Sequence, residues 1–512
     1  MSKLSTQIQS GDEAQEKILR GVKAVANVVG STMGYRGNLV LLETQGGLPK
    51  PTKDGWEVAE SIFLQDNLEA LACESAKEAA RKTVENAGDA TTATMVLLDA
   101  FLSSSINAIK DGESQITVAS KIEESKKLIL EHLDKISTPI TPELIYHVAK
   151  TSANGDEFIA KIVSDAYEKA GNNGSVGHTL SNNDDTFVDF VDGTLVERGY
   201  SDERFSNVMS NLTVLFEEEP LILISDINFQ TVRQIAPFLD YAAQHKKELL
   251  IISDMDYKVE SVILENKVKH GYRFAVVKPP AIGKKRTEYL SDLAIVCNTQ
   301  CVDALSGTDF VGRAEQFLGQ CKTILSTKDN TIVTKHDDLD PTPIQAKINE
   351  LKDLLKETEN KVAIQNIEDR IAKLSGMTAI VKVGGITPSE VEERVARVDD
   401  AIKAVRSAKE EGVVAGGGMA LHNCYEVLGD KLDEVSKMSV LAPLFRILSN
   451  ADVVETPELS YPYGYDVKSF QKVNMIEQGI VDATKCIKNA VENAISTSNT
   501  LSRCANAITL NR

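Results

Sequence analysis

The chain has 512 residues, of which 42% are hydrophobic and 26% charged, the balance of an ordinary globular protein with a large core. Its formal net charge of -19 argues against broad binding to nucleic acid or to anionic membranes, because both depend on an excess of lysine and arginine. At about 150 residues per domain, the length corresponds to roughly three domains.

The N-terminus and the cysteines indicate an intracellular protein. The first residues, MSKLSTQIQSGDEAQEK, contain no apolar core of signal-peptide length, and no window approaches a membrane-spanning run of apolar residues. The seven cysteines are scattered, so we interpret them as reduced thiols. We therefore expect no membrane span and a cytoplasmic location, in a bacterium or, for a viral protein, in its host.

Helical periodicity dominates the N-terminal part of the chain. A stripe of apolar residues with helical spacing ends at Gly30, and residues 45–58 carry the glycines and prolines of a turn-rich β segment. Helices are predicted at 18–29, 68–86, 91–109 and 121–136.

The middle of the chain changes period. Short runs of apolar residues predict buried strands at 221–224, 249–252 and 274–277, with helical patterns at 231–244 and 259–270 between them. This alternation is typical of a βαβαβ unit, in which helices cover a parallel sheet.

More helices follow the α/β unit. In two segments, 344–355 and 364–374, isoleucine and leucine recur at steps of three and four, which predicts a helical hairpin with a coiled-coil-like seam and no chemistry. Helices are also predicted at 395–411, 419–427 and 483–507. Because helical ends bracket the α/β unit, we predict an inserted module joined by two crossing segments, and such double connections make natural hinges.

The common nucleotide and metal motifs are missing. The sequence has no GxxxxGK(S/T), no GxGxxG and no HExxH, and its seven histidines are dispersed. Four small-residue or acidic clusters remain, each with a plain structural interpretation as well. Asp89 would serve as a helix N-cap, Asp54 and Gly55 would form a turn, and three glycines would form a loop. The clusters lie at 31–37, 52–55, 88–92 and 412–418.

Together and in this order, the four clusters resemble the motifs of group I chaperonins, the GroEL family. The matching residues are 32–35, 52–55, 88–94 and 413–418. The resemblance continues, and covers nearly the whole chain, at 152–157, 197–200, 397–401, 474–476 and 482–485. We identify the chain as a divergent member of this family, and a bacterial virus or another divergent source would fit.

The resemblance implies a chaperonin fold, with mostly helical and α/β parts in three domains. An equatorial ATP-binding domain would be formed by 1–136 and 410–512. A hinge-like intermediate domain would comprise 137–191 and 377–409, and an inserted α/β apical domain for substrate binding would comprise 192–376.

The resemblance also implies a site for ATP and Mg²⁺ at the helix start that follows Gly88. A helix N-terminus attracts phosphate, but Asp89 would repel it unless a cation bridges the two, and Mg²⁺ suits carboxylate, phosphate and water. Thr91 and Thr92 would donate hydrogen bonds to phosphate oxygens. The residues implied in nucleotide binding are Thr32, Met33, Gly34, Tyr35, Lys53, Asp89, Ala90, Thr91, Thr92, Ala93, Gly417, Asp466, Val467 and Asp482.

Further positions would complete this site. The turn at 32–35 would supply backbone contacts on the other side of the phosphates. Gly417 would let the backbone approach the ribose, and Asp482 would accept hydrogen bonds from ribose hydroxyls. Asp466 and Val467 fall where the family contacts adenine.

Hydrolysis requires a water molecule aligned on the γ-phosphate. Asp400 matches the family's carboxylate for that task, with Asp54 as its helper, and most of the catalysis would come from positioning and charge neutralisation. Because Asp400 lies on a crossing segment, it would reach the site only when the hinge closes. In the family a K⁺ ion also lies near the positions of Thr32 and Lys53.

In the inserted module, the family binds unfolded chains through apolar residues on two helices and a nearby extended segment. Exposed apolar surface of this kind normally marks a binding site, whereas the plain alternative is that several of these residues belong to the core. The matching positions are Tyr200, Phe205, Ile235, Leu239, Val259, Val262 and Leu264.

The sequence departs from the family at several of these places. Ala90 replaces a glycine, which is tolerable in a helical backbone and troublesome where φ is positive. Ala93 replaces a threonine, and Tyr35 replaces a proline. The face that binds clients and the family's lid-like co-chaperonin lacks larger apolar residues at Arg204, Ala236 and Glu265.

Three functions fit the resemblance. The leading hypothesis is an ATP-driven chaperonin whose homo-oligomeric ring, expected to be sevenfold and single or double, encloses non-native client proteins, with a co-chaperonin lid as a further partner to test. The alternatives are a ring ATPase dedicated to a narrow client, and a binding scaffold that has lost hydrolysis. Retention of Asp54, Asp89 and Asp400 argues against the scaffold.

Overall fold

The computed structural model forms two compact units. The first, called the discontinuous unit, joins Met1–Lys161 to Asp400–Arg512, and the second, the inserted unit, is Ile162–Asp399. Both predicted intermediate segments, 137–191 and 377–409, are divided between the two units, and the three-domain boundaries stay a prediction. The structure describes residues 6–43, 49–153, 155–171, 174–181, 183–191, 193–208, 212–307, 309–336, 338, 340–358, 361–375, 378–455 and 458–510.

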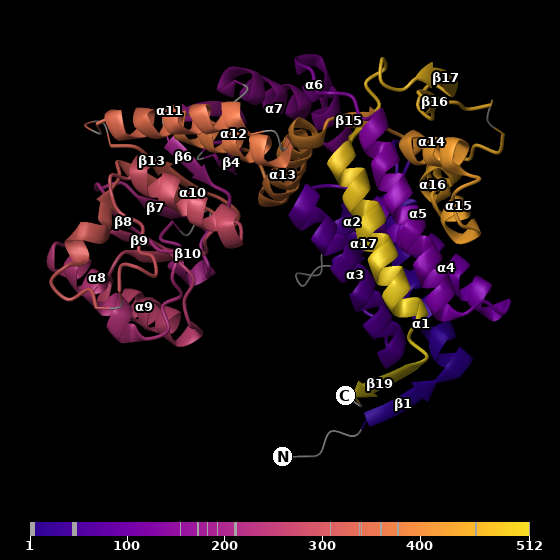
Figure 1. Ribbon diagram of the computed structural model, residues 1–512, viewed down its shortest axis with the longest axis horizontal. Helices are drawn as coiled ribbons and strands as arrows, with labels where there is room; N and C mark the ends of the chain where they lie inside the picture. Colours follow the sequence, from indigo (N-terminus) through magenta and orange to yellow (C-terminus); the bar gives the residue numbers. More distant parts are fainter. Residues whose placement is uncertain are drawn as a thin grey trace. The chain divides into compact units, whose positions relative to one another are not determined.

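Helices form most of the discontinuous unit (Figure 1). They are α1 (Gly11–Ser31), α2 (Gly55–Glu60), α3 (Asn67–Ala87), α4 (Thr91–Lys110), α5 (Gln115–Ile136), α6 (Pro142–Ser152), α14 (Met419–Leu428), α15 (Glu434–Ser439), α16 (Ala442–Asn450) and α17 (Thr484–Ser502). Its strands are β1 (Thr6–Ser10), β2 (Val40–Glu43), β3 (Pro49–Thr52), β15 (Val413–Ala415), β16 (Tyr463–Asp466), β17 (Gln471–Asn474), β18 (Val481–Ala483) and β19 (Asn506–Leu510). Two helices, α7 (Glu157–Ala170) and α13 (Pro388–Glu411), continue from one unit into the other.

Four long helices build the core of the discontinuous unit. Helix α17 packs on α3 and α4, and α1 packs on the same two helices (Figure 1). Among the described helices, α4 has the length and composition of a membrane span, but its Met95, Leu97 and Phe101 side chains are fully buried in this core. Burial of each such side chain contributes about 1.5–3 kcal/mol, so the apolar surface of α4 serves packing within the unit.

The predicted helices of this unit are confirmed, with one correction to the limits of a helix and one to the predicted β segment. The helix predicted at 483–507 ends at Ser502, and β19 then pairs antiparallel with β1, with Ile8 opposite Ile508. No local pattern reveals a strand whose only partner is at the other end of the chain. The β segment predicted at 45–58 is also shorter, because Asp54 caps α2; its residues 44–48 lie outside the described residues.

The inserted unit combines three sheets with covering helices. Its described strands are β4 (Ser175–Leu180), β5 (Phe187–Val191), β6 (Gly193–Val196), β7 (Val214–Phe216), β8 (Leu221–Ile224), β9 (Leu249–Ile252), β10 (Phe274–Val277), β11 (Leu318–Gln320), β12 (Thr323–Ser326), β13 (Thr331–Thr334) and β14 (Thr378–Val383). Its described helices are α8 (Val232–Gln244), α9 (Tyr257–His270), α10 (Gly283–Val296), α11 (Thr342–Glu357), α12 (Lys361–Ser375) and the short 3₁₀ helices η1 (Glu203–Phe205) and η2 (Ala314–Phe317).

The predicted βαβαβ unit is confirmed. Strands β8, β9 and β10 are parallel neighbours, and β11 extends the sheet on the antiparallel side of β8. A second sheet has the antiparallel order β6-β13-β12-β7, and a third has the order β4-β14-β5. The predicted hairpin is also confirmed, because Ile348 and Leu351 of α11 share one buried cluster with Ile371 and Leu374 of α12.

Candidate functional site

The connection between α3 and α4 is held closely by α13. Gly88 has φ +83°, and a Cβ atom at this position would lie 2.1 Å from the Cβ of Lys403. One turn further along α13, the Ser407 hydroxyl donates to the carbonyl of Ala87 at 2.7 Å. The glycine is therefore needed both for its left-handed backbone and for the close approach of α13.

Asp89 does not cap α4, so the predicted N-cap is wrong. The cap position is Ala90, which makes no side-chain cap and has φ +76°. The Asp89 carboxylate instead accepts from the Ala90 amide through Oδ1 and from the Ser152 hydroxyl through Oδ2, the latter at 2.8 Å. Ala90 thus occupies the left-handed conformation in which a glycine is favoured and a methyl group adds strain.

Three carboxylates gather around the start of α4. Burial raises the pKa of Asp89, hydrogen bonds from Ala90 and Ser152 oppose this, and the nearby charge of Asp54 raises the pKa further. Burial also raises the pKa of Asp482 to about 7, with a further contribution from Asp89. The site therefore brings carboxyl groups together where protein shields them from water, which favours their protonated forms.

The start of α2 touches the start of α4. Asp54 Oδ1 accepts from the amides of Trp56 and Glu57 and so caps α2. A Cβ atom on the adjacent Gly55 would lie 2.2 Å from Thr92 Oγ1 and 3.4 Å from Thr91 Oγ1. The structure therefore brings two of the predicted motifs, 52–55 and 88–94, into direct contact.

The turn after α1 is anchored by its own backbone and by α16. The buried Thr32 hydroxyl donates to the carbonyl of Val29 at 2.7 Å, and Asn450 of α16 donates to the carbonyl of Met33 at 2.9 Å. Gly34 follows with φ +81°. The predicted family-like turn is therefore a rigid feature whose backbone is positioned from two sides.

Lys53 and Tyr35 link this turn to the motif at 52–55. The Lys53 ammonium donates to the carbonyl of Tyr35 at 3.1 Å, and burial lowers the pKa of Lys53. The Tyr35 side chain itself is exposed. The replacement of a proline by Tyr35 therefore leaves the backbone turn in place and adds an aromatic ring at the surface.

On the other side of the discontinuous unit's site, β15 and β18 position Gly417 and Asp482. Val414 pairs with Asp482 across these two antiparallel strands. Gly417 has φ +65°, and a Cβ atom here would lie 2.7 Å from the terminal methyl of Met475. Glycine is consequently favoured at this position by its conformation, whereas the flexible end of the Met475 side chain could shift to make room.

Asp466 and Val467 already have local partners. The Asp466 carboxylate accepts from the Lys468 amide and from Ser469, which closes the turn between β16 and β17. The carbonyl of the buried Val467 accepts from Arg36 Nε at 2.7 Å. These contacts connect the turn to the segment after α1. Within the described part of the chain, no hydrogen bond or ion pair joins Asp466 or Val467 to Asp54, Asp89 or Asp482.

Asp400 lies on the face of α13 that meets the α3–α4 connection. Residues 400, 403 and 407 are separated by three and four positions, so Asp400, Lys403 and Ser407 share one face of the helix. Lys403 covers Gly88. Asp400 therefore lies about one helical turn, roughly 5 Å, from that contact, toward the start of α13.

Six of the seven residues predicted to bind clients are buried in this structure, and their role stays a prediction. Tyr200, Phe205, Ile235, Leu239, Val259 and Leu264 are at most 8% exposed and belong to the core of the inserted unit. Only Val262 is partly exposed. An apolar stripe on a helix looks the same in sequence whether it faces the core or a client, so the pattern could not distinguish them.

Other residues of the same helices carry the exposed apolar surface. Tyr257 and Val268 of α9 are 75% and 73% exposed, and Val232 at the start of α8 is also exposed. The polar replacements are tied into local ion pairs, Arg204 with Asp202 and Glu265 with Lys269. Sequence reasoning missed the exposed residues because each lies outside the regular apolar stripe of its helix.

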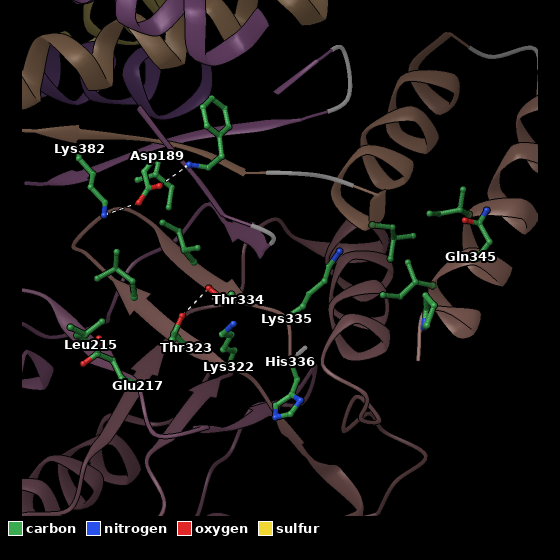
Figure 2. A pocket seen from close by; sticks show the side chains of 18 residues that line it. Asp189, Leu215, Glu217, Lys322, Thr323, Thr334, Lys335, His336, Gln345 and Lys382 are labelled. Carbon is green, nitrogen blue, oxygen red and sulfur yellow. Dashed lines mark hydrogen bonds and ion pairs between the residues drawn. The ribbon is translucent and has the colours of Figure 1, made fainter. Parts of the chain in front are cut away.

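A cavity of about 750 Å³ lies in the inserted unit, between the β6-β13-β12-β7 sheet and α11 (Figure 2). Its wall is held by an ion pair between Lys382 and Asp189 at 2.8 Å and by a hydrogen bond from Thr323 to Thr334 at 2.8 Å. None of the residues predicted to bind nucleotide or client lines this cavity. It therefore gives no support to either predicted site.

Comparison with known proteins gives two results. A family model described as the TCP-1/cpn60 chaperonin family matches residues 25–445. The fold is similar to that of the chaperonin gp146 from the bacteriophage EL 2 (Pseudomonas aeruginosa), crystallised in the presence of ATP-BeFx. For crystal form II the TM-score is 0.77, with 21% identity and 100% of both chains covered. For crystal form I the TM-score is 0.70, with 21% identity and 99% of both chains covered.

Proposed function

Because the chain belongs to the TCP-1/cpn60 chaperonin family, we propose that it is an ATP-dependent chaperonin that binds non-native proteins and promotes their folding. The family recognised from the motifs and the chaperonin fold implied by it are confirmed. What the proposal adds is the site: ATP binds at the start of α4 in the discontinuous unit. The observation that carries it is the convergence there of Asp54, Asp89, Thr91, Thr92 and Asp482.

The charge of this region favours a bound cation. Asp54, Asp89 and Asp482 are all acidic, and what raises the pKa of Asp89 and of Asp482 is burial followed by the charge of a neighbouring carboxylate. Buried negative charge of this kind is costly unless it is paired. A free nucleotide would add its phosphate charge to that of the carboxylates and increase the repulsion between them. A nucleotide that binds together with a metal ion would reduce this repulsion.

Asp89 is the residue we assign to Mg²⁺. Among the described residues no group of three or more His, Cys, Asp or Glu side chains is arranged to hold a metal ion, so phosphate oxygens and water would complete the shell. Bound Mg²⁺ would neutralise charge on the phosphates during transfer. Thr91 and Thr92, at the amino end of α4, would donate to the phosphates, and the backbone carbonyls of Thr32 and Lys53 would hold K⁺.

Asp400 is the residue we assign to the attacking water. Its face of α13 already meets the α3–α4 connection through Lys403 and Ser407. Asp54, the helper group, uses Oδ1 to cap α2, which fixes its carboxylate, and the adjacent Gly55 lies against Thr92. The roles of Gly417 and Asp482 at the ribose, and of Asp466 and Val467 at adenine, remain part of the same proposal.

The ATPase assignment is tested by steady-state hydrolysis of ATP with and without Mg²⁺. Asp400→Ala should lower turnover at least about 100-fold, because a positioned carboxylate contributes about that much or more. Glu392→Ala removes an exposed carboxylate from the same helix and should leave turnover unchanged. A wild-type protein without Mg²⁺-dependent turnover, or an Asp400→Ala variant as active as wild type, would refute the assignment.

The proposed assembly is a homo-oligomeric ring in the cytoplasm, sevenfold and single or double, with client proteins inside it. Chaperonin relatives form rings that bind clients, and Tyr257, Val268 and Val232 are the exposed apolar residues of α8 and α9 available for that contact. Negative-stain images of the purified protein would give the ring symmetry directly.

The range of client proteins would distinguish a general chaperone from one dedicated to a narrow client. The ion-paired Arg204 and Glu265 make the surface of α9 and η1 more polar than a general client-binding face. Refolding of a generic denatured enzyme, measured with and without a co-chaperonin lid, distinguishes the two. Recovery of activity above the spontaneous yield supports general action, and no recovery despite ATP hydrolysis supports a dedicated client.

A further inference from the structure

We propose that Ser152 is a positioning residue for the Asp89 carboxylate, and that α6, which ends at Ser152, connects that carboxylate to the β18 side of the site. The Ser152 hydroxyl donates to Asp89 Oδ2 at 2.8 Å. This inference rests on the proposed function, since it concerns the carboxylate assigned to Mg²⁺. It adds a residue and a helix to that site.

The Ser152 hydroxyl donates away from its own helix. A serine in the last turn of a helix commonly donates back to the carbonyl four residues earlier. Ser152 instead donates out of α6, to a side chain 63 positions away in sequence. Together with the Ala90 amide on Oδ1, this bond holds both oxygens of Asp89 and so sets the rotation of the carboxylate.

Helix α6 also packs on the side of the site that we assign to the ribose. Helix α6 packs against β18, the strand that contains Asp482. The ring of His147 lies so close to Gly479 that a Cβ atom there would be 2.0 Å from Nδ1. One helix of eleven residues therefore contacts both the segment before Asp482 and the carboxylate of Asp89.

This arrangement has a consequence for metal binding. Before Mg²⁺ binds, the Ser152 hydroxyl limits the rotation of a carboxylate that would otherwise be free on Oδ2. Pre-organised ligands bind metal more tightly, whether Ser152 then keeps its bond to Oδ2 or gives it up to the ion. Binding of nucleotide with Mg²⁺ should then change the local stability of α6.

The Mg²⁺ requirement for ATP hydrolysis tests the role of Ser152. Ser152→Ala should raise the Mg²⁺ concentration for half-maximal turnover about 10-fold or more, the size of effect known for groups that orient metal ligands. Ser152→Thr keeps the hydroxyl and should restore most of the wild-type dependence. Thr151→Ala removes the neighbouring, exposed hydroxyl and should match wild type.

Hydrogen exchange of the α6 amides gives a readout independent of turnover. ADP with Mg²⁺ should change the exchange of α6 in the wild type and much less in Ser152→Ala, while α15, which is remote in sequence, reports the background. Circular dichroism confirms that the variants are folded. A Ser152→Ala variant with the wild-type Mg²⁺ dependence and the full wild-type response of α6 exchange to ADP and Mg²⁺ would overturn the inference, while Asp400→Ala still tests the ATPase. A wild type that fails to bind nucleotide would overturn the proposed function itself.

Discussion

At the scale of single residues, Ala90 is the most informative position in the site. Its φ of +76° lies in the left-handed region that favours glycine, which is the residue that the resemblance to group I chaperonins implies here. The left-handed region costs a residue with a side chain about 1–2 kcal/mol. The methyl group therefore leaves strain in the segment that we assign to the phosphates.

Relief of this strain is measurable. Ala90→Gly should stabilise the folded protein by about 0.5–1 kcal/mol, because the strain removed exceeds the entropy that glycine adds to the unfolded chain. Ala93→Gly lies inside α4 and should instead destabilise it by about 1 kcal/mol. Denaturant unfolding measures the change in the free energy of unfolding for each variant. A change of the same sign in both would show that Ala90 is not strained.

Asp482 is a second residue with a measurable consequence. Its pKa in the fold is about 7, whereas an unfolded aspartate has a pKa of about 3.9, so the folded state favours the protonated form. Between these two pH values the folded state binds more protons, and stability must fall as pH rises. The main cause is burial of the Asp482 carboxyl group, and the nearby charge of Asp89 adds to it.

Asp482→Asn should remove this pH dependence in the nucleotide-free protein. Stability at pH 8 should rise by at most about 4 kcal/mol, the free-energy equivalent of a shift of about three pH units, and stability at pH 4 should hardly change. Asp430→Asn, at an exposed turn, serves as the control. Denaturation midpoints at the two pH values, without nucleotide, test this; an equal gain at both would show a cause other than ionisation.

At the scale of elements, the contact between α13 and the α3–α4 connection decides where Asp400 lies. The contact depends on the lack of a side chain at Gly88, against which Lys403 packs, and on the bond from Ser407 to Ala87. Helix α13 runs without interruption from Pro388 to Glu411. A small displacement at Gly88 should therefore move the whole face that carries Asp400.

Gly88→Ala should uncouple this contact. The new Cβ atom would lie 2.1 Å from Lys403 Cβ, and the left-handed backbone adds strain, so a loss of about 2 kcal/mol or more is expected together with reduced ATP turnover. Gly112→Ala introduces the same kind of backbone strain at φ +104° with nothing within 4 Å. Comparing the ATP turnover of the two variants distinguishes the clash with Lys403 from backbone strain. Equal losses of turnover would show that backbone strain alone causes the effect.

At the scale of the whole molecule, the ends of the chain offer surface for assembly. Ile8 and Ile508 are opposite each other in the β1–β19 pair and are 70% and 66% exposed. Leu39 and Leu41, beside and within β2, are 68% and 67% exposed. Short two-stranded sheets with apolar faces and unpaired edges are natural contacts between copies of a chain.

Ile8→Lys should weaken the proposed oligomer by placing a charge on this face. Gln7→Lys adds the same charge to the adjacent residue, whose side chain points to the other face of the strand, and should have a smaller effect. Light scattering during gel filtration measures the mass of each assembly. An Ile8→Lys protein with the wild-type mass would exclude the β1–β19 face as a subunit contact.

The sequence by itself determined the family, the class of fold and the positions of most elements. Periodicity placed the strands at 221–224, 249–252 and 274–277, and the four motifs identified the family later matched over 25–445. Periodicity and motifs are both local signals. The spacing of apolar side chains follows the geometry of a helix or strand, and a turn motif consists of consecutive residues.

Only the tertiary structure decided which of those residues meet and which are buried. The bond from Ser152 to Asp89 and the pairing of β1 with β19 join positions far apart in the chain, and neither leaves a local pattern. Phe205 and Ile235 turned out to be core, because burial depends on what packs against a face and not on the face alone. The same holds for Ala90, whose left-handed backbone is imposed by the connection around it.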